Sequence, residues 1–130
     1  MRFPIVLFAV QIALLATHQV DAAFWHEWDV FGVPGGIPFF LAFHFGAMLV
    51  LLASFAAVAS GHRQQRAFTL GAAATGGLTA ALHAIFLARD RIAFWTLPSL
   101  AVLGAIVVVA VAQVATTQVD RPHPRGAPLP

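Results

Sequence analysis

Three histidines and an aspartate stand in otherwise apolar stretches of this sequence, and their side chains could do chemistry there. They are His18, Asp21, His44 and His83. An ionisable side chain such as Asp costs about 2.5–3.5 kcal/mol at the centre of a membrane-crossing helix, so such groups tend to face the protein interior and to be functional. Neutral imidazole and carboxylate together suit divalent ions such as zinc, iron, copper or manganese. The four residues are therefore candidate metal ligands.

Two further candidates follow the first apolar stretch, in the segment His26-Glu27-Trp28-Asp29. His26 comes eight residues after His18, so a helix that continued this far would place both side chains on roughly one face. Glu27 would then point away from that face, and an acidic surface turn is the competing interpretation. We therefore rank His26 and Glu27 as metal ligands behind the first four candidates.

The composition indicates a protein whose surface faces lipid. Hydrophobic residues make up 60% of the 130 residues and charged residues only 9%, and the mean hydropathy is +0.85. A soluble domain carries roughly 25% charged residues. All seven basic residues are Arg and form no basic stripe, so nucleic acid is not an expected partner. The absence of Cys excludes disulfides and thiol chemistry.

Four apolar stretches are long enough to cross a bilayer, which takes about 20 mainly apolar residues in a helix. They run over about 3–20, 37–59, 67–87 and 94–114. The stretches are rich in Ala and Leu and do not alternate with polar residues, which argues against strands. We predict an all-α membrane protein, a four-helix up-down-up-down bundle, as one domain over 1–119. The Pro-rich segment 120–130 is expected to be a disordered tail.

The distribution of Arg predicts the orientation of these spans. One side of the predicted bundle carries five Arg residues: Arg2, Arg63, Arg66, Arg121 and Arg125. The other side carries Arg89 and Arg91. Because Lys and Arg in short loops favour the cytoplasmic side, we expect cytoplasmic termini and a multi-pass protein of the inner (plasma) membrane. The bilayer is then its surroundings, and a second copy or another membrane protein is a possible partner.

A cleavable signal peptide is an alternative interpretation of the first 22 residues. Arg2 precedes an apolar run, and Val20-Asp21-Ala22 before Ala23 resembles a cleavage site. Cleavage would leave three spans and would remove His18 and Asp21. Asp is unusual within a cleavage motif, so the interpretation with four spans is preferred.

The predicted topology places the three histidines at a similar depth. With a rise of about 1.5 Å per residue, His18 and His83 lie near the outer ends of their helices, and His44 lies about 10 Å below the outer surface. The third stretch also has a ridge of small residues at four-residue spacing, which lets helices approach closely. The ridge is formed by Ala72, Gly76 and Ala80, and His83 continues it. We therefore expect the candidate ligands to converge near the outer leaflet.

The sequence resembles an uncharacterised family of small bacterial membrane proteins with four helices and a pattern like His-Glu-x-Asp-Ala…His-Glu-Trp. The matching segments are His18-Gln19-Val20-Asp21-Ala22 and His26-Glu27-Trp28, followed by a His early in the next span and another late in the third. The resemblance implies that all six candidates belong together: His18, Asp21, His26, Glu27, His44 and His83. Gln19 stands where the family often has Glu, which removes one potential ligand. The resemblance implies no activity.

Three kinds of function remain open at this point. The first is a site for a divalent metal ion, at which an enzymatic reaction could take place. The second is the binding or transport of a small or lipid-like molecule, since His and carboxylate groups in a bundle can relay protons or contact a polar head group. The third is a structural accessory subunit in which the polar layer only fixes helix packing. Whether the protein is an enzyme is left open by the sequence.

Overall fold

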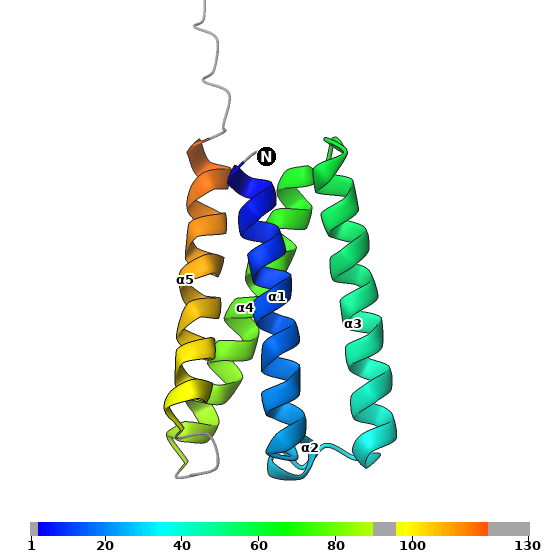
Figure 1. The fold of residues 1–130 in the computed structure, drawn as a ribbon, viewed down its shortest axis with the longest axis vertical. Helices are drawn as coiled ribbons and strands as arrows, with labels where there is room; N and C mark the ends of the chain where they lie inside the picture. Colours follow the sequence, from blue (N-terminus) through cyan, green and yellow to red (C-terminus); the bar gives the residue numbers. More distant parts are fainter. Residues whose placement is uncertain (1–2, 90–95, 120–130) are drawn as a thin grey trace, which may run out of the picture.

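The computed structural model describes residues 3–89 and 96–119, and these residues form five helices and no strand. The elements are α1 (Phe3–Phe24), α2 (Glu27–Val30), α3 (Gly36–Ala59), α4 (Gln65–Leu87) and α5 (Leu97–Val119). The four long helices lie side by side and alternate in direction, and the short α2 lies at one end between α1 and α3 (Figure 1). Each long helix is long and apolar enough to cross a membrane. The predicted all-α four-helix architecture is confirmed.

The helix bounds differ from the predicted spans mainly at their ends. α1 continues to Phe24, beyond the expected end at about residue 20, because the apolar residues after Asp21 extend the helix. α5 begins at Leu97 and carries Pro98 in its first turn, where a missing backbone N–H costs little. The expected start of this span at residue 94 and the tail 120–130 lie outside the described residues.

The small-residue ridge of α4 packs against two neighbouring helices. Gly76 is buried, and a Cβ atom added there would overlap the amide of Gln11 on α1 and lie 3.0 Å from a methyl group of Ile106 on α5. Ala72 belongs to the main core cluster together with Phe8 and Ile106. The three helices α1, α4 and α5 are thus held together by close approach at Gly76 and by the apolar core around it.

A cavity lies beside the first half of helix α3. This cavity of about 310 Å³ separates this part of α3 from α1 and α4, and α2 closes one end of it. Its lining residues come from α1, α2, α3, α4 and the α2–α3 link, and none of them comes from α5. This cavity is the setting of the polar residues described next.

Candidate metal centre

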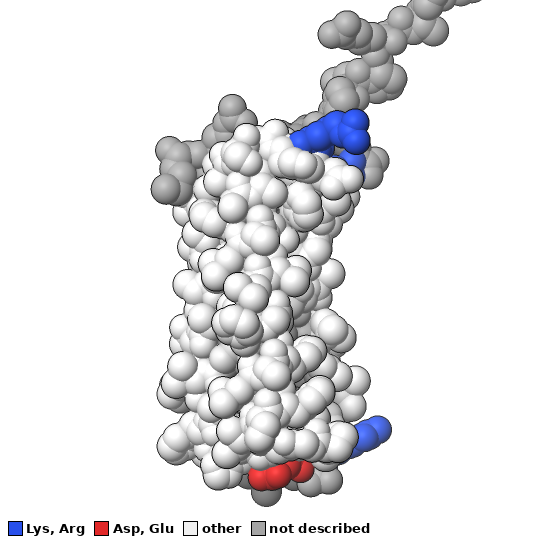
Figure 2. Space-filling model, turned by 90° about the vertical axis from the view of Figure 1, so that its right-hand side faces the viewer, with Lys and Arg blue, Asp and Glu red and all other residues white. Residues whose placement is uncertain are grey.

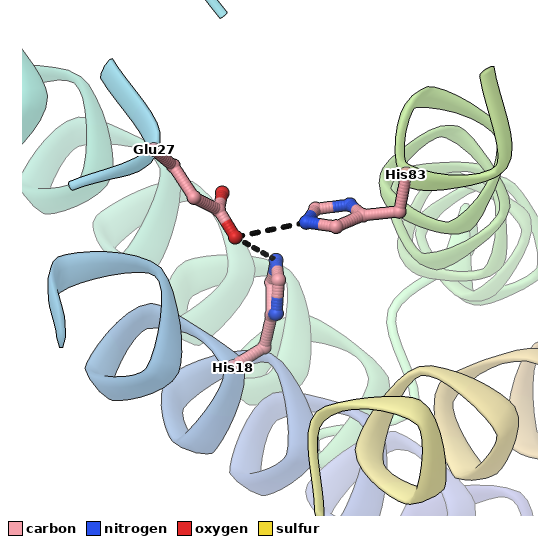
Figure 3. Close-up of side chains that lie close together, drawn as sticks. All are labelled: His18, Glu27 and His83. Atoms are coloured by element: carbon pink, nitrogen blue, oxygen red, sulfur yellow. Dashed lines mark hydrogen bonds and ion pairs between the residues drawn. The ribbon is translucent and has the colours of Figure 1, made fainter. Parts of the chain in front are cut away.

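Three buried side chains from three different helices meet at one edge of the cavity. His18 of α1, Glu27 of α2 and His83 of α4 point toward one another (Figure 3). The Nε2 atom of His83 lies 2.8 Å from Oε1 of Glu27, and Nε2 of His18 lies 4.0 Å from the same oxygen. The three residues are 3%, 5% and 2% exposed, in chain order. Their potential ligand atoms all lie within 4.8 Å of one another.

The inward position of Glu27 results from a sharp change of chain direction after α1. The helix ends at Phe24, and His26 adopts left-handed backbone angles of φ 50° and ψ 51°. The next residues then form the short α2, in which Glu27 and Trp28 are both buried. The Trp28 ring packs against Phe40 of α3 with 5.0 Å between ring centroids. This packing holds α2 across the end of the bundle with Glu27 directed inward.

The expectation of a helix that continues from His18 through His26 is therefore wrong. It assumed an unbroken helical period, whereas the backbone leaves the right-handed region at His26. Glu27, which that period directed away from the site, is the residue that both histidines face. His26 itself is exposed, and its ring stacks on Trp28 with 5.0 Å between centroids.

Backbone and aromatic contacts fix the orientation of the His83 ring. Its Nδ1–H donates a hydrogen bond of 2.8 Å to the carbonyl oxygen of Thr79, one turn earlier on α4. This bond directs Nε2 toward Glu27. The ring of Phe31 meets the His83 ring edge to face at 5.4 Å, and the His18 ring does the same at 4.7 Å. Metal-binding histidines in proteins almost always donate their second N–H in this way.

The contacts of His83 also require a positive charge or a shared proton in this group. With Nδ1–H donated to Thr79, a neutral His83 ring has only a lone pair at Nε2. A lone pair 2.8 Å from a carboxylate oxygen is repulsive unless a proton or a cation lies between the two atoms. His18 has its Nδ1 buried and without a hydrogen-bond partner among the described residues. The group is thus built to hold a positive charge between its donor atoms.

The other sequence-predicted candidates lie outside this group. Asp21 accepts a hydrogen bond of 3.0 Å from the hydroxyl group of Ser99, so it joins α1 to α5. His44 lines the same cavity as the three grouped residues, and its Nδ1–H donates a bond of 2.7 Å to the carbonyl oxygen of Phe40. The structure therefore brings together His18 and His83 with Glu27 from the lower-ranked pair, and not with Asp21 or His44.

The sequence alone carried little indication of the roles of Glu27 and Ser99. The residue pattern of the resembled family groups Glu27 with His18 and His83, whereas spacing on a continuous helix separates them. Ser99 is inconspicuous in the sequence, because serine is common as a hydrogen-bonding residue near the ends of helices. Its contact with Asp21 joins residues 78 positions apart.

Comparison with known proteins identifies the family of the chain. A family model described as "Family of unknown function (DUF6713)" matches residues 5–120, which is nearly the whole chain and covers the described helices except for the first two residues of α1. No match was found among the curated proteins or among the solved structures. The chain of four apolar helices with a buried His-Glu-His group belongs to the DUF6713 family of unknown function.

Proposed function

We propose that this protein is a membrane-embedded metalloprotein in which His18, Glu27 and His83 bind one divalent metal ion. The observation that carries the proposal is the meeting of three buried ligand atoms from three helices within 4.8 Å. Burial of a carboxylate is costly unless the group is paired or bound to a metal. Two imidazoles and one carboxylate form a ligand set that proteins use for iron and zinc, with coordination positions left open.

The distances are close to those of an occupied site. Imidazole nitrogen and carboxylate oxygen lie about 2.0–2.2 Å from zinc, which places two ligands of a tetrahedral ion about 3.3–3.6 Å apart. The observed separations of 2.8 Å and 4.0 Å from Glu27 Oε1 fall on either side of this range. Side-chain movements of roughly half an ångström would equalise them. An ion would also remove the repulsion between the Nε2 lone pair of His83 and the Glu27 carboxylate, as a shared proton would.

The ligand set and its surroundings limit the chemistry of such a site. The chain has no Cys, so the soft thiolate ligands preferred by copper(I) are absent. Iron(II), manganese(II) and zinc(II) accept this mixture of nitrogen and oxygen. All three residues line the cavity, so open coordination positions would face it. An ion there could polarise or activate a small bound molecule.

The competing function is purely structural, and one specific observation favours it. In this account, called the hydrogen-bonded lock, the bond between His83 and Glu27 only fixes α2 to α4. Both ring nitrogens of His83 lie within hydrogen-bond distance of an oxygen atom. A proton shared with Glu27 would satisfy this geometry without any metal, and it would tie α2 to α4 in the way a structural subunit requires. The substitution Glu27→Gln distinguishes the two accounts. The glutamine amide can keep the hydrogen bond to His83, but it is a much weaker metal ligand than the glutamate carboxylate.

Elemental analysis of protein purified in mild detergent tests the proposal. The wild-type protein should retain close to one equivalent of iron, manganese or zinc, and His18→Ala, Glu27→Ala and His83→Ala should each lose it. His62 is a matched control, because it lies in the exposed α3–α4 link. His62→Ala should therefore keep the metal. Equal metal content in all five proteins would show that the ion is bound elsewhere, and no metal in any of them after reloading would favour the lock.

We also propose that the site lies near the outer face of a bacterial plasma membrane. The support is charge asymmetry: Arg63 in the α3–α4 link and Arg66 in the first turn of α4 lie at one end, whereas acidic side chains gather, together with Arg89, at the end that carries α2 (Figure 2). The positive-inside rule assigns the Arg-rich end to the cytoplasm. A reporter active only in the cytoplasm, fused after Pro130, should then be active. A mature N-terminus at Ala23 would contradict the site, because His18 would have been removed.

A further inference from the structure

Five aromatic rings and seven other apolar side chains line the cavity beside the His-Glu-His group. These rings belong to Trp28, Phe31, Phe39, Phe40 and Phe43. Aromatic side chains prefer edge-to-face or offset contacts with other rings, with centroids about 4.5–7 Å apart. A flat ring could make such contacts on several sides of this cavity at once. A saturated chain would gain less, because it lacks the charge distribution of an aromatic face.

The volume of the cavity favours a small occupant. Its 310 Å³ lies at the lower end of the range of about 300–1,000 Å³ that is usual for ligand sites. A single substituted ring fits such a volume, whereas a complete membrane lipid does not. The volume of the cavity and its lining residues both favour a compact ring compound.

The cavity opens toward lipid. Three lining residues on α3 and α4 are also strongly exposed on the bundle surface, with exposed fractions of 49% for Phe39, 59% for Phe43 and 62% for Leu78. All three lie within helices long and apolar enough to span the membrane. An occupant would therefore enter sideways from the bilayer, so it must be soluble in lipid.

Besides the His-Glu-His group, the polar residues that line the cavity are Gln19, His44, Thr75 and Thr79. The side-chain oxygen of Gln19 is buried and has no hydrogen-bond partner among the described residues, so it is an available acceptor. The hydroxyl groups of Thr75 and Thr79 donate to carbonyl oxygens of their own helix. The His44 ring donates its Nδ1–H to Phe40, which leaves Nε2 as an acceptor. An occupant that matches His44 must therefore offer a donor such as O–H. Its oxygen could also reach a metal ion at His18, Glu27 and His83, which line the same cavity.

We propose that this cavity binds a lipid-soluble ring compound that carries a hydroxyl group, of the phenol or quinol class. The ring packs among the aromatic side chains. The hydroxyl group is recognised by His44 and by the metal site. The contact between the hydroxyl group and the metal site rests on the proposed function. The packing of the ring in the cavity and the hydrogen bond to His44 do not depend on a metal.

The test measures the binding of two matched probes to the detergent-purified, metal-loaded protein. Durenol (tetramethylphenol) has the required hydroxyl group, and durene (tetramethylbenzene) has the same methylated ring without it. Durenol should bind saturably, with durene about tenfold weaker for the loss of one good hydrogen bond. Palmitate should not displace durenol. Equal affinity of both probes, or displacement by palmitate, would overturn the proposal.

Variants in α3 separate specific binding from partition into detergent. Ala47 lines the cavity, so Ala47→Phe should fill it and abolish saturable durenol binding. Ala53 lies six residues, or about one and two-thirds turns, further along the same helix. It is exposed, so Ala53→Phe is the matched control and should bind durenol normally. His44→Phe keeps an aromatic ring of similar size and should weaken durenol binding about tenfold without affecting durene.

Metal content measured on the same samples distinguishes the two proposals. Ala47→Phe and His44→Phe should keep the metal, because neither residue belongs to the His-Glu-His group. Metal retention in the wild type without saturable durenol binding would overturn this inference and leave the metal site standing. Saturable durenol binding that is lost in Ala47→Phe, in a protein that binds no metal, would overturn the proposed function and leave the ring-binding cavity standing.

Discussion

The Nε2 atom of His83 lies 2.8 Å from Oε1 of Glu27, although the two residues are 56 positions apart in the sequence. This contact joins α2 to α4, and His18 of α1 adds a third side chain to it. A covering helix of only four residues is thus fixed to two membrane-spanning helices through one carboxylate. Loss of this carboxylate should affect both the folding of the end of the bundle and the binding of a metal.

Two substitutions of Glu27 separate these effects. Glu27→Ala should lower the free energy of unfolding by about 1–3 kcal/mol, because His83 would lose its partner in a buried site. Glu27→Gln keeps a hydrogen-bonding side chain of the same size and should cost less than about 1 kcal/mol. Both variants should lose the metal. Thermal unfolding of metal-free protein in detergent measures the first effect, and a Glu27→Gln variant that retained full metal content would contradict the assignment of Glu27 as a ligand.

The close approach of α1, α4 and α5 depends on Gly76. A leucine there would overlap the amide of Gln11 and crowd Ile106, so Gly76→Leu should destabilise the bundle by about 1–3 kcal/mol, as overpacked cores do. Gly77 is the matched control, because a Cβ atom added there would meet no atom within 4 Å in the part of the chain that the structure describes. Gly77→Leu should leave the melting temperature unchanged or raise it, and equal losses in the two variants would show that the Gly76 face does not pack.

The bond between Asp21 and Ser99 predicts a structural role for a residue that the sequence nominated as a metal ligand. Ser99 is 1% exposed and donates its hydroxyl hydrogen to Asp21. Ser99→Ala should therefore destabilise the protein by about 1–3 kcal/mol, as expected for a lost bond to a charged group, and leave the metal content unchanged. Ser60→Ala, at an exposed serine, should have almost no effect on either quantity. Metal loss in Ser99→Ala alone would place Asp21 in the metal site.

The sequence predicted the four long helices because each is a long apolar run, and membrane-spanning length and hydropathy are local properties of the chain. The position of His83 could also be anticipated, since it continues the small-residue ridge that contains Gly76. The inward direction of Glu27 could not, because it depends on the left-handed backbone at His26 and on the packing of Trp28 against Phe40. The contact of Asp21 with Ser99 could not be predicted either, because the two residues are 78 positions apart and belong to different helices.

X-ray absorption spectroscopy of the zinc-loaded protein tests the central proposal most directly, because it reports the atoms bound to the ion. We expect nitrogen and oxygen ligands at about 2.0–2.2 Å, with the multiple-scattering signal of two imidazole rings. The His83→Ala variant, reloaded with zinc, should show one imidazole ring or bind no zinc, and His44→Phe should give the wild-type spectrum. A wild-type spectrum without imidazole ligands, or one that His83→Ala leaves unchanged, would contradict a metal site at His18, Glu27 and His83.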